Sequence, residues 1–336
     1  MADESLFNFH AESIVIDAVC PLVMNDLSHI DWYREGGVTA LAPTVGSTDN
    51  ARATLDRLAT WHRVLRQRHD LLLVRQARDI EIAKQSGRLG VYFHIQGTDP
   101  VEDNLDLIDL YKALGVGVIQ LTYNVKNRVG DGCEERANAG LSRFGVKLIE
   151  RLNIARVIVD CSHTGLHTAL DAIEHSTAPV ILSHSNVGSV HANPRNVENQ
   201  LIDAIAQSDG VIGIVGFPAM VAGTTTPSLD EFIAHIDAIA QRVGVNHVGL
   251  GIDYYPGQSG VASNEMAMRA YNEAVRRGVW GTAYPPPPHH YPIGIETPRT
   301  LPNLTYRLLE RGTYSDDDVR KILGGNWLRV MRTVWG

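Results

Sequence analysis

Short apolar runs alternate with longer amphipathic segments along the chain. The apolar runs are rich in β-branched residues, as expected for strands that are buried on both faces of a parallel sheet. Eight such runs lie at Ile14–Cys20, Val38–Ala42, Gly90–Ile95, Val118–Leu121, Val157–Cys161, Val180–Ser183, Val211–Val215 and His247–Gly251. Amphipathic helices are predicted between them at Ala51–Arg68, Asn104–Leu114, Gly145–Leu152, Leu166–Glu174, Val197–Gln207 and Leu229–Val243. Because parallel neighbours need a helical crossover, this alternation predicts an α/β fold, a TIM-type (β/α)8 barrel.

Two parts of the chain are longer than a barrel requires. In the N-terminal half, Leu71–Val74 predicts an extra strand and Ala77–Gln85 an extra helix. After the eighth strand, a helix at Asn264–Arg277 leads into residues 278–302, where four consecutive prolines exclude a helix or a central strand. We expect a proline-rich surface loop there. The last three helices are expected at Asn303–Arg311, Ser315–Leu323 and Asn326–Val334, within a single domain that spans residues 1–336.

Charge and composition narrow the classes of partner. The formal net charge is -8 and the sequence has no Lys/Arg-rich run, which argues against nucleic acid or an anionic membrane surface. A small-molecule substrate is the better expectation. The N-terminal sequence MADESLFNFHAES is acidic where a secretion signal is basic, and no apolar stretch approaches the ~18 residues of a membrane span. We therefore expect a cytoplasmic protein.

Two of the predicted strands end in the dipeptide Ser-His. The segment from Val157 to Asn186 contains both, with a helix-length polar stretch between them, and therefore predicts a βαβ unit with His163 and His184 just past its strands. The carboxyl ends of parallel neighbouring strands meet at one edge, so these imidazoles should lie side by side. Paired histidines there suggest a metal or proton-transfer site. The alternative is that each histidine merely caps a strand or begins a loop.

Polar side chains also follow other predicted strands at their carboxyl ends. They are Gln96 after the third, Tyr123 after the fourth and Asp253 after the eighth. In a barrel these positions converge with the two histidines on one face, which is where barrel enzymes build their active sites. The pattern predicts a common cavity for all five side chains.

Several segments resemble the membrane (renal) dipeptidase family. They are VIVDCSHTG, PVILSHSNVGSVHANPRNV and HVGLGIDY, with LGVGVIQLTYN upstream and LPNLTYRLLERG and LGGNWLRV near the end. The resemblance extends from Ile14 to Trp335. It implies a TIM-type barrel that hydrolyses dipeptides with two zinc ions, bridged by a glutamate and a water-derived hydroxide.

Four of the family's functional residues are present at matching positions. The resemblance implies that His163 and His184 are metal ligands, that Arg195 binds the substrate and that Asp253 is the catalytic aspartate.

Other positions depart from the family's pattern. The family's first strand ends in Asp-Gly-His-Asn-Asp, whose His and last Asp bind one zinc, and here Val19 and Pro21 replace them. The bridging glutamate corresponds to Gln96, which offers one neutral carbonyl oxygen, and the family's substrate-binding histidine corresponds to Tyr123. We therefore expect zinc to bind as one ion at most.

A single zinc held by His163 and His184 would need a third ligand, because a catalytic zinc usually has three protein ligands. Gln96, Asp253 and His94 are the candidates. Cys20 should face the outer helices by strand alternation, and His289 and His290 lie in the proline-rich segment, where adjacent histidines seldom form a closed site. Cys20, Cys133 and Cys161 are too few for a disulfide framework.

The leading hypothesis is a hydrolase of small dipeptide or amide substrates that carry a carboxylate. Asp253 would move a proton from water to the leaving amine, Arg195 would hold the carboxylate, and Tyr123 would donate to the developing oxyanion. Two rivals remain. One is a metal-free protein that binds a carboxylate ligand, and the other is a non-hydrolytic acid/base enzyme. The resemblance also suggests a homodimer or higher homo-oligomer.

Overall fold

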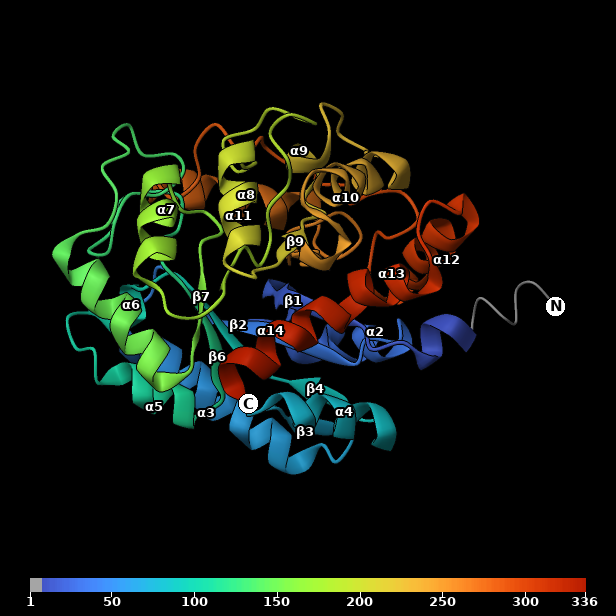
Figure 1. Cartoon of the computed structure of the whole chain (residues 1–336), viewed down its shortest axis with the longest axis horizontal. Coiled ribbons are helices and arrows are strands. Elements are labelled where there is room, and N and C mark those ends of the chain that lie inside the picture. Colours follow the sequence, from blue (N-terminus) through green and yellow to red (C-terminus); the bar gives the residue numbers. More distant parts are fainter. Residues whose placement is uncertain (1–7) are drawn as a thin grey trace.

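A closed parallel barrel forms the centre of the molecule in this computed structural model, which describes residues 8–336 (Figure 1). The part of the predicted domain before residue 8 lies outside the described residues. The strand order is β8-β7-β6-β5-β2-β1-β10-β9, and a parallel bridge between Leu182 and Ile212 joins the two ends. The barrel strands are β1 (Ile16–Cys20), β2 (Ala40–Gly46), β5 (Phe93–Gln96), β6 (Val116–Gln120), β7 (Ile158–Asp160), β8 (Val180–Ile181), β9 (Ile212–Ile214) and β10 (Val248–Leu250). The predicted TIM-type barrel is confirmed.

Amphipathic helices surround the strands, as the spacing of apolar residues predicts. They are α3 (Ala51–Gln67), α5 (Leu107–Ala113), α6 (Arg143–Ala155), α7 (Leu166–His175), α8 (Asn199–Gln207) and α10 (Leu229–Val243). Ser228 starts α10 with a capping box, in which its hydroxyl accepts from the Glu231 amide and the Glu231 carboxylate accepts from the Ser228 amide. Such caps satisfy amides that the first helical turn leaves free.

The predicted insertion in the N-terminal half is present. Strand β3 (Leu71–Leu73) and helix α4 (Ala77–Ser86) lead into β4 (Leu89–Val91), which pairs with both β3 and β2. The predicted strand Gly90–Ile95 is therefore two strands, β4 and β5, interrupted at Tyr92. Figure 1 shows β3, β4 and α4 together below the barrel.

The C-terminal helices close the floor of the barrel. After α12 (Pro302–Arg311), helix α13 (Asp316–Arg320) continues through a π-helical turn, Lys321–Gly325, into α14 (Asn326–Trp335), so the predicted break before Asn326 is wrong. Helix α14 packs its apolar face against the inward-facing residues of the strands. The indole N–H groups of Trp327 and Trp335 donate to the carbonyls of Leu250 and Gly117 at 3.0 and 3.2 Å.

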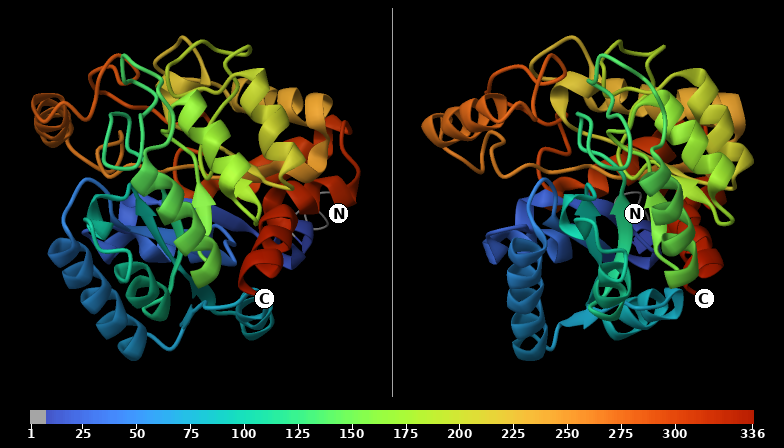
Figure 2. Two further views of the ribbon diagram at one scale, coloured as in Figure 1. Left: turned by 60° about the vertical axis from the view of Figure 1, so that its left-hand side comes forward. Right: turned by 90° about the vertical axis from the view of Figure 1, so that its left-hand side faces the viewer.

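The segment after β10 covers the opposite, open end of the barrel. It contains α11 (Asn264–Arg276), which projects from the body in both views of Figure 2, and an irregular stretch that ends in a 3-10 turn, Pro298–Thr300. Pro285 and Pro286 are exposed, whereas Tyr284, His289 and Tyr291 are buried. The proline-rich segment is thus irregular, as predicted, but its aromatic side chains pack inward around Phe217. Shorter helices missed by the pattern are α2 (Ile30–Glu35) and α9 (Pro218–Val221).

Candidate active site

Sharp backbone turns after the strands position the predicted site residues. His163 and Asp253 each lie three residues past the end of a strand, β7 and β10, and both have φ 61°. Asn124, beyond β6, has φ 58°. Side chains other than glycine seldom adopt this left-handed conformation, and it costs on the order of 1 kcal/mol or more, so the surrounding structure must hold it in place. Non-glycine residues with positive φ cluster at functional sites.

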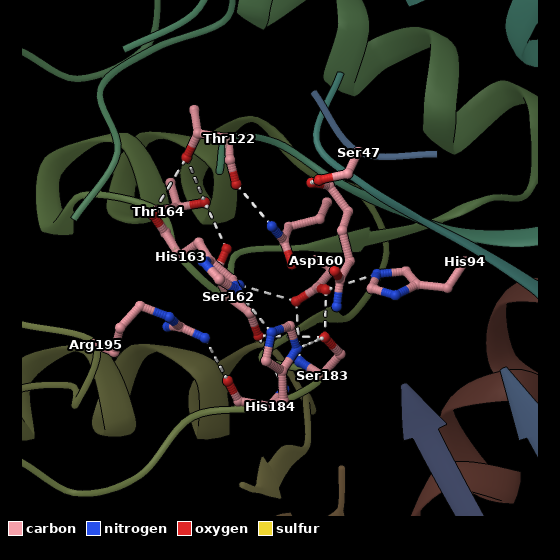
Figure 3. A network of polar contacts seen from close by, with 12 residues as sticks. Ser47, His94, Thr122, Asp160, Ser162, His163, Thr164, Ser183, His184 and Arg195 are labelled. Atoms are coloured by element: carbon pink, nitrogen blue, oxygen red, sulfur yellow. Dashed lines mark hydrogen bonds and ion pairs between the residues drawn. The ribbon is translucent and has the colours of Figure 1, made fainter. Parts of the chain in front are cut away.

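His163 and His184 lie side by side, as predicted. Their Nε2 atoms are 2.7 Å apart and their ring centroids are 4.8 Å apart. Both side chains are buried, and Figure 3 shows them at the centre of a network of polar contacts. Burial lowers the pKa of each imidazole well below its ordinary value, and the positive charge of Arg195 lowers it further. Both rings are therefore neutral at pH 7.

Asn124 fixes the tautomer of His163. The Asn124 amide nitrogen donates to the carbonyl of Val279 at 2.8 Å, so its oxygen is the atom that faces His163 Nδ1 at 2.6 Å. An amide oxygen can only accept, and His163 Nδ1 must therefore carry the proton. The lone pair of His163 is left on Nε2, where it points towards His184.

Ser183 and Asp160 fix the tautomer of His184. The Asp160 carboxylate accepts the Ser183 hydroxyl at 2.5 Å. With its proton used in this bond, the Ser183 oxygen accepts from His184 Nδ1 at 2.7 Å. His184 therefore also carries its proton on Nδ1. The two neutral rings turn two Nε2 lone pairs towards one point, which is an arrangement that suits a shared cation.

His94 occupies a different place from the one proposed for a third metal ligand. Its Nε2 is 3.1 Å from the Asp160 carboxylate, and its ring centroid is 6.5 Å from that of His184. Burial alone would raise the pKa of Asp160, but its hydrogen bonds with His94 and Ser183 hold it at about 2. Asp160 is thus ionised and also accepts the backbone amides of Ser162 and Ser183, both at 2.9 Å. His94 orients the network through Nε2, whereas its Nδ1 is buried without a hydrogen-bond partner among the described residues.

Among the carboxyl groups of the site, Asp253 has the most strongly raised pKa. Burial raises its pKa to about 8, although the nearby charge of Arg195 and a hydrogen bond from Gln96 oppose the shift. The charge of Asp17, another buried carboxyl, raises it further. Asp253 is therefore largely protonated at pH 7 in the protein alone. A carboxyl group with a pKa near the working pH suits proton transfer.

One cavity of about 290 Å³ brings together most of the predicted site residues. Gln96, Tyr123, His163 and Asp253 line it. His184 lies directly behind His163 and does not belong to the lining, so the prediction of a common cavity holds for four of the five side chains. The ring of Tyr123 stacks on His163 with the centroids 4.3 Å apart.

Arg195 lies in a neighbouring cavity of about 190 Å³, which His163 also lines. Its side chain is buried, its Nη2 donates to the carbonyl of His184 at 3.1 Å, and its Nε donates to the Tyr284 hydroxyl at 3.1 Å. Tyr284 itself lines the larger cavity. The phenol ring of Tyr284 and the imidazole of His163 therefore stand between the cavity of Asp253 and that of Arg195.

Sequence reasoning missed the aromatic wall of the larger cavity. It consists of side chains from three separate segments: Phe217, Tyr255, Trp280 and Tyr284. Trp280 stacks on Tyr284 with centroids 4.6 Å apart and rings nearly parallel, and its indole N–H donates to the Tyr123 hydroxyl at 3.1 Å. The one signal in the sequence is the concentration of aromatic residues around the four prolines, which is unusual for an exposed surface loop.

Comparison with known proteins identifies the family. A family profile described as "Membrane dipeptidase (Peptidase family M19)" matches residues 25–282 and 280–335. The chain belongs to the membrane dipeptidase family. Dipeptidase verJ of Clonostachys rogersoniana is 27% identical over 325 residues, which are 92% of this chain and 75% of that protein. Dipeptidase aclJ of Aspergillus oryzae is 28% identical over 290 residues, which are 84% of this chain but 61% of that protein.

Solved structures with the same barrel include an amidohydrolase from Pseudomonas aeruginosa. It matches with a TM-score of 0.89 and 31% identity, covering 98% of this chain and 99% of that one. A metallo peptidase from Rhodobacter sphaeroides, solved with a phosphinate mimic of the dipeptide L-Ala-D-Ala, has a TM-score of 0.78 at 17% identity and covers 96% of this chain. At that identity the likeness shows the fold alone.

The two-zinc centre that the family resemblance implies does not fit these residues. Pro21 forms part of the cavity wall, and Val19 is fully buried, so the first-strand positions offer no ligand atoms. Within residues 8–336, no group of three His, Cys, Asp or Glu side chains is arranged to hold a metal ion. Asp253 and His94 are thereby set aside as third ligands, and of the three proposed candidates the amide oxygen of Gln96 is left.

A single cation fits the donor set of His163 and His184 better. Zinc–nitrogen bonds of about 2.0–2.1 Å at tetrahedral angles place two ligating nitrogens roughly 3.3 Å apart. The observed 2.7 Å between the Nε2 atoms would therefore have to open by about 0.6 Å on binding.

Other candidate ligands lie away from this pair. Cys20 packs in the outer core, as strand alternation predicts. His289 is buried against Phe217, where burial lowers its pKa to about 4.

Two further sequence expectations concern membrane-spanning segments and disulfide bonds. No helix within residues 8–336 is long and apolar enough to cross a membrane. Cys20, Cys133 and Cys161 are free thiols.

Proposed function

We propose that this chain hydrolyses an amide bond in a small peptide-like substrate that carries a carboxylate, with at most one zinc ion, held by His163 and His184. The observation that carries the proposal is the convergence of the two Nε2 lone pairs next to a cavity that contains the protonatable Asp253. Membership of a peptidase family supports the hydrolytic class of reaction.

Asp253 is the proposed proton carrier of the reaction. In its ionised form it takes a proton from the attacking water, and it then delivers that proton to the nitrogen of the leaving amine. Its raised pKa makes it a strong enough base to accept the proton from water and leaves it protonated near neutral pH afterwards. A zinc ion at the histidine pair would supply a Lewis acid that polarises the substrate carbonyl and acidifies water.

Tyr123 is proposed to stabilise the negative charge that develops on the carbonyl oxygen. Its hydroxyl oxygen accepts the indole N–H of Trp280, which leaves the hydroxyl proton available to donate into the cavity. Stacking against His163 restricts the ring to one orientation. A donor that is already oriented stabilises an oxyanion without the cost of rearrangement.

Arg195 is proposed to bind the substrate carboxylate from the neighbouring cavity. Two of its donors already bind protein groups, the Tyr284 hydroxyl and the His184 carbonyl, so the guanidinium is fixed in place. Because His163 lines both cavities, a substrate that lies across this ring can present its amide to Asp253 and its carboxylate to Arg195.

Two substitutions separate cation binding from proton transfer. His184→Ala should lose both zinc binding and turnover, whereas Asp253→Asn should retain zinc and lose turnover. Asn has the shape of Asp but cannot accept a proton. Zinc content after dialysis and the hydrolysis of a panel of dipeptides and N-acyl amino acids are the two measurements. Exposed His167→Ala, on helix α7, is the matched histidine control and should change neither.

A metal-free ligand-binding protein is the second candidate. It is favoured by one observation, the 2.7 Å contact between the Nε2 atoms, which is shorter than two zinc ligands allow. If zinc-supplemented protein holds no metal and hydrolyses nothing in the panel, this second candidate replaces the first. The cytoplasmic location and the homo-oligomer expected from the sequence stay predictions.

A further inference from the structure

We propose that the larger cavity selects an uncharged apolar acyl group, so that the preferred substrate is an N-acylated amino acid and not a dipeptide with a free α-ammonium group. This inference rests on the proposed function, because it names the substrate class of the same site. It goes beyond that function in assigning the cavity on the acyl side of the scissile amide to an uncharged group.

The lining of the larger cavity is apolar on most sides. Four aromatic rings form one wall, and Pro21, Met24 and Pro256 add aliphatic surface. Apolar surface of this kind is stabilised by contact with an apolar group that leaves water, at roughly 25 cal/mol per Å². A phenyl-bearing or alkyl acyl chain would therefore gain free energy by entering it.

The cavity offers an ammonium group no acidic side chain other than the proposed base, Asp253. Asp253 is the one carboxyl group in the lining, and its carboxyl already has Gln96 as a hydrogen-bond neighbour. Pro21 stands where the family resemblance places an aspartate, so this position adds no charge either. An ammonium group that enters this cavity would find Asp253 as its one counter-charge, and pairing with it would take the carboxylate away from its proposed work as the base.

The aromatic rings are poorly placed to bind an ammonium group by cation–π contacts. A cation binds over the open face of a ring, yet Trp280 and Tyr284 cover one face of each other, with the ring planes 7° apart. Tyr123 has one face covered by His163, with the ring planes 24° apart. Phe217 meets Tyr284 edge to face, with centroids 5.5 Å apart. These rings form a packed wall and not a cage around a cation.

The two cavities together match the two ends of an N-acyl amino acid. The carboxylate would lie in the smaller cavity near Arg195, and the acyl group would lie against the aromatic wall of the larger one. His163 lines both, which places the amide bond between them and beside the histidine pair. Hydrolysis adds water across this C–N bond and gives a free carboxylic acid and an amino acid.

A matched pair of compounds tests the inference. L-Phe-L-Ala and N-(3-phenylpropanoyl)-L-Ala differ only in the α-ammonium group, and the D-Ala forms extend the comparison. We expect the acyl compound to have a kcat/KM at least about tenfold higher, because an ammonium group either pairs with the base or stays buried and unpaired, at a cost above about 1.4 kcal/mol. Where no turnover occurs, quenching of tryptophan fluorescence gives the dissociation constants, and the same ratio is expected.

A charge added to the cavity wall should reverse the preference. Pro21→Asp places a carboxylate in the lining, and Met24→Glu does so from a neighbouring position if the first variant does not fold. Either should shift the ratio towards L-Phe-L-Ala by about tenfold. Ile154→Asp adds the same charge on the exposed face of α6, where the side chain is 71% exposed, and should leave the ratio unchanged.

The outcomes separate this inference from the proposed function. Turnover of both compounds with a ratio near one, or a preference for L-Phe-L-Ala, overturns the inference and leaves the hydrolase proposal standing. Binding that favours the acyl compound without turnover of any compound supports the inference and overturns the hydrolase proposal.

Discussion

His94 and Asp160 are hydrogen-bonded inside the barrel, with 3.1 Å between His94 Nε2 and the carboxylate and both side chains fully buried. The same carboxylate holds the Ser183 hydroxyl, which in turn accepts from His184. Through this chain of contacts the pair sets the orientation of one of the two histidines at the centre of the site.

This buried contact should contribute strongly to stability. His94→Leu leaves a buried carboxylate without its partner, so the free energy of unfolding should fall by about 3–5 kcal/mol. Combining it with Asp160→Asn should destabilise by less than the sum of the two single changes, because the uncompensated charge is gone. Urea unfolding at pH 7 measures both effects. A loss below about 1 kcal/mol in His94→Leu would show that Asp160 does not depend on this partner.

Asp253 should titrate near pH 8 in protein stripped of metal. Infrared difference spectra between the wild type and Asp253→Asn should show a protonated carboxyl group at pH 7 that disappears as the pH passes through about 8. Where the wild type is active, kcat/KM should rise over the same range, since the base form is required. A carboxyl signal that is lost near pH 4 contradicts the assignment.

The raised pKa of Asp253 also predicts a cost to stability. A carboxyl group with a folded pKa above its unfolded value stabilises the protein only at low pH, and this contribution is lost as the pH rises towards 8. Asp253→Asn should therefore increase the free energy of unfolding by roughly 5 kcal/mol at pH 8 and by much less at pH 4. Equal effects at the two pH values would mean that the carboxyl group is not desolvated in the folded state.

His235 should make the fold sensitive to acid. Its ring is buried between the Val187 amide, which donates to Nδ1 at 3.1 Å, and the Val221 carbonyl, 2.9 Å from Nε2. Burial lowers its pKa to about 4, so stability that is complete above pH 6.5 is lost as the pH falls towards 4. The loss should amount to about 3 kcal/mol and be absent in His235→Gln. Chemical unfolding at pH 7 and pH 4.5 gives the comparison, and parallel losses in the two proteins would count against it.

Arg195→Lys should weaken substrate binding more than turnover. Lysine keeps the charge but loses the planar fork that binds a carboxylate with two hydrogen bonds. We expect KM to rise at least about tenfold with a smaller change in kcat, which corresponds to a loss of 1.4 kcal/mol or more. Substrates whose carboxylate is replaced by a primary amide should lose far less on this substitution. The same loss for acid and amide substrates would argue against an Arg195–carboxylate contact.

The sequence predicted the histidine pair because local pattern and topology agree there. A β-branched run that ends in Ser-His indicates where a strand ends. Parallel neighbouring strands then bring the residues at their carboxyl ends together. Other strands begin and end at different residues from those predicted, because the pairing between strands is irregular there. The second strand runs from Ala40 to Gly46 and not from Val38 to Ala42, and Pro43, which lacks an amide donor, pairs opposite Cys20 where the register shifts.

The aromatic wall could not be predicted in the same way. Phe217, Tyr255 and Trp280 come from different loops, and no periodicity connects residues that meet only when the loops pack over the barrel. The hydrogen bond of His94 to Asp160 is similarly non-local, since it joins β5 to β7 past the strand between them, β6. Strand alternation predicts that His94 shares the strand face of Gln96. It does not predict that His94 Nε2 contacts Asp160.

Hydrolysis measured against zinc added to metal-free protein tests the single-cation site most directly. With an N-acyl amino acid as substrate, kcat/KM should rise to a plateau at one equivalent of zinc per chain, because only His163 and His184 offer converging lone pairs within the described site. A plateau that requires two equivalents, or no hydrolysis at any zinc concentration, would contradict this account.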